Sequence, residues 1–184
     1  MSLCSDWQRR ALDLRLPALR GLLFRAIPTT IFVQHKPCDR TGEMRSMSYD
    51  STSPIRRINP AELGSPPGYS QIVDVRASRI FFIAGQTALD RTGAVVGKND
   101  FAAQAEQVFR NLSTALQAVG CTAGNLAKLT VFLRDMSNLA AYREARNRFF
   151  ATVTPPAAPA VTLIEVSKLY GPDFLIEIEA VAAI

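Results

Sequence analysis

The pattern of hydrophobic and polar residues along the chain becomes regular after about residue 54. Three segments then predict β-strands, at 55–59, 69–76 and 79–87, and Gly and Pro residues separate them. The second segment alternates between apolar and polar residues, and the third is strongly apolar. From Phe101 the apolar residues instead recur every three to four positions as far as Val119, which predicts a helix that ends near Gly120. This part of the chain therefore predicts three strands followed by one helix.

The remainder repeats this change of period. Residues 126–133 predict a strand, Ser137 can cap a helix that continues to about residue 150, and residues 160–168 and 174–182 predict two more strands. One side of the second helix carries Leu139, Tyr142, Arg146 and Phe149. The order β-β-β-α-β-α-β-β predicts an α+β domain with a mixed sheet and both helices on one face. The other face carries apolar as well as polar residues, so we expect it to pack against another subunit of a homo-oligomer.

The formal net charge of +5 lies mostly in the first quarter of the chain. Residues 1–47 contain eight Lys/Arg and four Asp/Glu, whereas residues 48–184 contain thirteen and twelve. The predicted domain has no basic stripe with interleaved aromatic residues, and we expect no nucleic-acid partner. No apolar run approaches the ~18 residues that a membrane-spanning helix needs, so we expect no membrane partner either.

Residues 1–54 form a basic extension to the domain predicted at 55–184. Arg and Leu mix at roughly helical spacing between Trp7 and Ala26, but Pro17 interrupts the pattern. An Arg-rich, amphipathic targeting peptide is one interpretation. The other is a disordered tail, or a start site upstream of a natural start at Met44 or Met47.

The cysteine and histidine contents limit the chemistry of the domain. The spacing of the three cysteines fits neither a zinc site nor a disulfide framework, and we expect Cys121 to be a reduced thiol in a cytoplasmic protein. The single histidine, His35, lies outside the domain, which excludes a His-based metal site or a Ser-His triad there. We therefore expect no metal and no cofactor, and chemistry by carboxylates, tyrosine, arginine, backbone groups and water.

Five segments, in this order, resemble the RidA (YjgF) family. They are GYSQ at 68–71, IAGQ at 83–86, AAQ to NL at 102–112, KLTVFLRDM at 128–136 and IEIEA at 176–180. The resemblance extends from Tyr69 to Ile184, and it implies a chorismate-mutase-like fold and a homotrimer with small pockets at the subunit interfaces. It also implies a small-molecule substrate, because active members hydrolyse reactive enamines and imines to ammonia and a 2-keto acid.

Three positions match pocket residues of the family. Tyr69 matches a tyrosine that lines the cleft or relays a proton, and the alternative is a half-buried ring with its hydroxyl on the backbone. Gly85 matches a strand-end glycine that a ligand approaches closely, and the alternative is a bulge. Glu177 matches a glutamate that holds a water, and the alternative is a carboxylate on a solvated face shared with Glu179. A buried Glu177 beside a second carboxylate would have a raised pKa and could exchange protons.

Val161 is the first departure from the family pattern. Residues 159–166 read PAVTLIEV, and the family's deaminases have an arginine in the third position that grips the substrate carboxylate. Valine cannot bind a carboxylate, and losing a charge-assisted contact costs about 1.5–3 kcal/mol, which is a tenfold loss of affinity or more. Thr162 and Leu163 lie beside this position and can offer backbone groups to a ligand.

Arg143 is the second departure, because it occupies a helix position where the family's deaminases often have an asparagine. It either reaches the pocket and replaces the missing guanidinium, or it is an exposed helix arginine that pairs with a surface acid such as Glu144.

Two functions follow from these residues. One is a deaminase or hydrolase of an enamine, imine or related amino-unsaturated acid that uses Glu177 and water. The other is a non-catalytic trimer that binds a small molecule. No motif supports a third function, a chaperone-like or translation-associated protein.

Overall fold

The computed structural model describes residues 54–184, so the predicted extension lies outside the described residues except for Pro54. Within these residues the chain forms six strands: β1 (Ile55–Ile58), β2 (Ile72–Val75), β3 (Ile80–Gln86), β4 (Leu126–Leu133), β5 (Ala160–Glu165) and β6 (Ile176–Ala183). The helices are α1 (Phe101–Ala118) and α2 (Leu139–Phe150), and the 3-10 turns are η1 (Ala61–Leu63), η2 (Ala123–Asn125) and η3 (Met136–Asn138). This order confirms the predicted α+β class.

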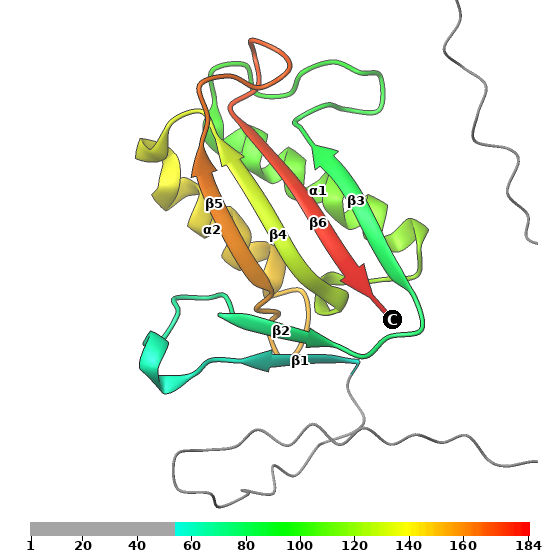
Figure 1. Cartoon of the computed structure of the whole chain (residues 1–184). Coiled ribbons are helices and arrows are strands. Elements are labelled where there is room, and N and C mark those ends of the chain that lie inside the picture. Colours follow the sequence, from blue (N-terminus) through cyan, green and yellow to red (C-terminus); the bar gives the residue numbers. More distant parts are fainter. Residues whose placement is uncertain (1–53) are drawn as a thin grey trace, which may run out of the picture. The chain divides into compact units, whose positions relative to one another are not determined.

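The strands form two sheets. β1 and β2 make an antiparallel pair of their own, and the larger sheet has the order β3-β6-β4-β5. β4 and β5 are parallel, and the other pairs in the larger sheet are antiparallel, so this sheet is mixed as predicted. Both helices lie behind one face of the larger sheet, and its other face is open (Figure 1).

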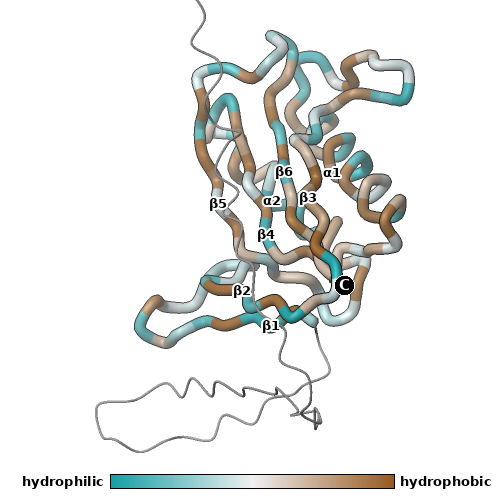
Figure 2. The backbone as a smooth tube through the Cα atoms, turned by 45° about the vertical axis from the view of Figure 1, so that its right-hand side comes forward, coloured by the Kyte–Doolittle hydropathy of each residue, from teal (hydrophilic) through white to brown (hydrophobic). Residues whose placement is uncertain are grey.

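The core lies between the helices and the larger sheet. Buried and less buried residues alternate over 128–133 of β4 and 176–182 of β6: Leu129, Val131, Ile176 and Ile178 are fully buried, whereas the residues between them point to the open face. Hydrophobic residues recur along both helices and the sheet strands in Figure 2. Each fully buried aliphatic side chain contributes about 1.5–3 kcal/mol, so this layer carries most of the stability of the domain.

Three predicted element ends are wrong. Ser137 does not cap α2, because it lies inside η3 and its own backbone N–H donates to the Asp135 carboxylate at 2.8 Å. β5 ends at Glu165 rather than at residue 168. β2 begins at Ile72, since Tyr69 and Ser70 belong to the loop before it and Ser70 bridges to Ala160 instead.

Within residues 54–184, neither helix has the length and apolar character needed to cross a membrane.

Candidate functional site

Gly85 and Glu177 lie against each other where β3 pairs with β6. The register of this pair shifts between Ile83 and Gln86, so Gly85 lies in an irregular stretch of the strand. A Cβ atom on Gly85 would lie 2.7 Å from Glu177 Cδ and 3.0 Å from Cγ, and it would overlap Oε1. The missing side chain of Gly85 is therefore the space that the Glu177 carboxyl occupies.

The Glu177 carboxyl is partly buried on the open face of the sheet. Glu179 is the next residue of β6 on this face, and the two carboxyls lie opposite Phe132 and Thr130 of β4. Burial raises the pKa of Glu177, and the negative charge of Glu179 raises it further. Glu177 therefore holds a proton to higher pH than a free glutamate does, which suits a group that gives and takes protons.

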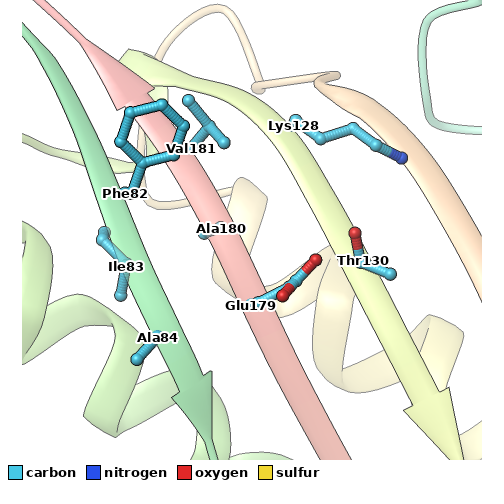
Figure 3. Close-up of a pocket in the computed structure, with 8 residues that line it drawn as sticks. All are labelled: Phe82, Ile83, Ala84, Lys128, Thr130, Glu179, Ala180 and Val181. Atoms are coloured by element: carbon cyan, nitrogen blue, oxygen red, sulfur yellow. The ribbon is translucent and has the colours of Figure 1, made fainter. Parts of the chain in front are cut away.

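A hollow of about 310 Å³ lies beside these carboxyls on the same face. Eight residues of β3, β4 and β6 line it: Phe82, Ile83, Ala84, Lys128, Thr130, Glu179, Ala180 and Val181 (Figure 3). Lys128 Nζ donates to Thr162 Oγ1 and, at 3.1 Å, to the Leu129 carbonyl. Burial lowers the pKa of Lys128, and the nearby Glu179 opposes this shift. The hollow does not include Gly85 or Glu177.

The Tyr69 loop runs beside the start of β5. Ser70 N donates to the Pro159 carbonyl at 3.0 Å, and Ser70 Oγ donates to the Ala158 carbonyl at 2.7 Å. Ser70 also forms a parallel bridge to Ala160, the residue before Val161. Because Tyr69 precedes Ser70, it lies at the end of the sheet where β5 begins, and its side chain is half-buried.

Val161 and Leu163 turn to the helix side of the sheet. They pair with Leu129 and Val131 of β4, and their half-buried side chains pack against the core between sheet and helices. Thr162 is exposed on the opposite face, where its hydroxyl accepts from Lys128. Within one chain, Val161 and Glu177 therefore lie on different faces of the sheet.

Five of the seven predicted site residues consequently fall into two groups. Gly85 and Glu177 meet on the open face, at the junction of β3 and β6. Tyr69, Val161 and Leu163 lie at the edge formed by β5. Arg143 is exposed on α2, and its side chain forms no hydrogen bond or ion pair with another residue of 54–184, so it does not pair with Glu144.

Arg146 is a residue whose chemistry the sequence patterns did not single out. Its side chain is only 7% exposed, and its Nη2 donates to the Asn147 side-chain oxygen at 3.0 Å and to the Pro67 carbonyl at 3.4 Å. The available signal was its position on the apolar side of the predicted helix, where an arginine must bury its charge. Among residues 54–184, no three His, Cys, Asp or Glu side chains gather in a way that could hold a metal ion.

The element order, the mixed sheet and the two helices on one face define a chorismate-mutase-like α+β fold, as predicted. The model of the family described as Endoribonuclease L-PSP matches residues 60–184. The chain therefore belongs to this family, which is the RidA (YjgF) family that the sequence segments indicated.

Similar proteins agree with this assignment. The RutC family protein slr0709 of Synechocystis is 39% identical over 132 residues, which are 71% of this chain and 97% of that protein. A protein named 2-iminobutanoate/2-iminopropanoate deaminase from Salmonella typhimurium is 36% identical over 67% of this chain and 90% of its own length. Among solved structures, the Rid family protein YyfB of Yersinia pestis superposes with a TM-score of 0.64 at 33% identity, and it covers 72% of this chain and 100% of its own.

Proposed function

We propose that this protein is a deaminase that hydrolyses an enamine, imine or related amino-unsaturated acid with a water held by Glu177. The observation that carries the proposal is the Gly85–Glu177 contact, in which a partly buried carboxyl with a raised pKa fills the space above a glycine backbone. The similarity to relatives named 2-iminobutanoate/2-iminopropanoate deaminase, from Salmonella typhimurium and Mus musculus, supports the substrate class.

The reaction requires little from the protein. Glu177 takes a proton from water as the water oxygen bonds to the carbon of the protonated imine, and a neutral carbinolamine forms. The carboxyl then gives this proton to the nitrogen. As the carbon–nitrogen bond breaks and the C=O bond forms, the hydroxyl proton passes to the Glu177 carboxylate, and ammonia and a 2-keto acid leave. In this scheme the backbone at Gly85 allows the substrate to approach closely, and the Tyr69 hydroxyl lines the pocket or relays a proton.

The proposed site is completed by a neighbouring subunit of a homotrimer. One chain places Glu177 and Val161 on opposite faces of its sheet, so the two groups of candidate residues can face one pocket only across an interface. The open face also exposes Phe82, at 83%, and Ile164, which a partner would cover. Light scattering should give about 60 kDa, three times the 20.1 kDa chain, and a mass of one or two chains would contradict this arrangement.

Turnover of freshly generated 2-iminobutyrate or 2-aminoacrylate tests the deaminase. The expected result is that ammonia and the 2-keto acid appear together with the wild-type protein and that Glu177→Gln lowers kcat by about 10²-fold or more. Glu62→Gln, a change in the exposed η1 turn, is the matched control and should retain full activity. Equal rates with and without wild-type protein would contradict the proposal for these substrates.

The second candidate function is a non-catalytic trimer that binds a small molecule. It is favoured by Val161, because a half-buried valine on β5 supplies no charge to a carboxylate. Saturable binding of 2-ketobutyrate without turnover of any imine would identify this function. Arg143, Thr162 and Leu163 stay predicted ligand contacts in both cases, and the cytoplasmic location also stays a prediction.

A further inference from the structure

Arg146 is a buried cation with only neutral partners. Its Nε and Nη2 donate to the Asn147 side-chain oxygen at 3.3 and 3.0 Å, and Nη2 also reaches the Pro67 carbonyl. Neither partner carries a negative charge, and Arg146 forms no ion pair with any residue between 54 and 184. A guanidinium with five donors in such a place is suited to an anion supplied from outside the chain.

The hydroxyl of Tyr142 is a second unused donor next to this guanidinium. Tyr142 is 1% exposed, and its hydroxyl faces the Arg146 guanidinium, which can only donate to it, so the hydroxyl proton meets no acceptor in the described region. Arg146 Cζ lies 5.9 Å from the centre of the Tyr142 ring, one turn along α2. Buried hydroxyls are normally paired, so this one needs either a water or a ligand atom as acceptor. A carboxylate has enough lone pairs to accept from both side chains at once.

The guanidinium lies at the entrance to the Tyr69 loop. Arg146 Nη2 would be 2.6 Å from a Cβ atom on Gly68, so the close approach depends on the missing side chain there. Gly68 also has a φ of +78°, in the left-handed region that favours glycine. Two residues later Ser70 bridges to Ala160, the neighbour of Val161. Arg146 therefore reaches, from α2, the same end of β5 where the family's arginine is replaced by valine.

We propose that Arg146 anchors the carboxylate of the substrate, with the Tyr142 hydroxyl as a second donor. The anchor has thus moved from β5 to α2, and the ligand class is a small 2-imino acid and its 2-keto acid product. This inference rests on the proposed function for the identity of the substrate. The competing role is structural, in which Arg146 only clamps the Pro67–Gly68 loop to α2 and a water occupies the remaining donors.

Calorimetry with two probes separates these roles. The probes are 2-ketobutyrate and its uncharged amide, 2-ketobutyramide, added to the full chain. Arg146→Gln should weaken 2-ketobutyrate binding about tenfold or more and change binding of the amide less than about twofold. Tyr142→Phe should weaken binding of the acid by a smaller factor. The matched control is Arg148→Gln, since Arg148 lies on the same helix and pairs with Glu106 instead.

Several results would overturn the anchor. If Arg146→Gln weakens binding of 2-ketobutyrate and of 2-ketobutyramide equally, Arg146 only clamps the Pro67–Gly68 loop. If the affinity for 2-ketobutyrate is unchanged, Arg146 has no role in binding it. Loss of binding with Arg143→Ala instead would place the anchor at Arg143, and no 2-ketobutyrate binding to the wild type at millimolar concentration would remove the site. If Arg146→Gln does not fold, Arg146→Lys keeps the charge without the fork and should weaken only the acid. If 2-ketobutyrate binds with an affinity that depends on Arg146 but no ammonia is released from the imines, the deaminase proposal is wrong and the proposal for Arg146 stands.

Discussion

Replacing Gly85 by alanine tests the site at its most constrained point. The new Cβ would lie 2.7 Å from Glu177 Cδ, whereas ordinary van der Waals contacts begin near 3.4 Å. The carboxyl must therefore retreat by about 0.7 Å at Cδ, and Oε1 must move further. A displacement of this size at a catalytic group costs on the order of 10²-fold in rate. The expected result is a kcat for 2-iminobutyrate reduced about 10²-fold.

The stability of this variant should change little. No left-handed φ is present at Gly85, so alanine fits the backbone there, and the clashing atoms belong to the far end of a flexible side chain. We expect a change in unfolding free energy of about 1 kcal/mol or less, measured by urea denaturation. Gly124→Ala is the matched control, because its Cβ would meet only Thr122 Oγ1 at 3.4 Å. An active Gly85→Ala protein, with kcat equal to that of Gly124→Ala, would refute a catalytic Glu177 at this position.

Three further changes test the electrostatics and the core. Because the folded-state pKa of Glu177 is raised, its stabilising effect is complete at low pH and is lost as pH rises through that pKa, so Glu177→Gln should raise Tm at pH 8 and leave it unchanged near pH 4; equal Tm differences at both pH values would contradict this. Gln104→Ala should lower the free energy of unfolding by about 3 kcal/mol and should also lower kcat. The buried Gln104 side chain donates to the carbonyls of Gly97 and Asp173 and accepts from Leu175 N, just before β6. A fully active variant would show that these hydrogen bonds do not position the site. Leu112→Ala opens a cavity in the core and should lower the free energy of unfolding, measured by denaturation, by about 3 kcal/mol. Its kcat should be unchanged, and a loss of kcat would contradict the assignment of Leu112 to the core alone.

Much of the fold could be predicted because apolar residues recur with a period of about two in strands and about 3.6 in helices. The apolar stripe predicted for α1 follows from burial on one side only, and it is seen almost residue for residue. β4 lies where a strand was predicted, and its residues 128–133 alternate between buried and less buried positions. Ser137 misled because it is a good capping residue by type, but it lies inside η3, which Asp135 caps, and α2 begins after Asn138 without a side-chain cap. Local preference identifies candidates for a cap, and only the path of the chain decides between them.

The site was less predictable, because it depends on register and side-chain direction. The contact between Gly85 and Glu177 requires the shift between Ile83 and Gln86, and nothing in either strand specifies that shift. The hydrogen-bond partners of Arg146 are Asn147, the next residue, and Pro67, which lies 79 residues away in the sequence. That no acidic side chain pairs with Arg146 among residues 54–184 therefore follows from the three-dimensional structure and not from the sequence. The alternation in β6 did correctly place Glu177 and Glu179 on one face.

The position of β6 in the middle of the sheet has a consequence for synthesis. It is the last of the six strands described between residues 54 and 184, yet it separates β3 from β4, so the larger sheet cannot form until residues 176–183 have left the ribosome. Before that point the nascent chain exposes the apolar side of α1 and two unpaired strand edges, which are surfaces that chaperones recognise. A ribosome that pauses within codons 176–183 would therefore hold a chain in which the larger sheet is incomplete, whereas a pause between α1 and β4 comes before β4, β5 and β6 have been made.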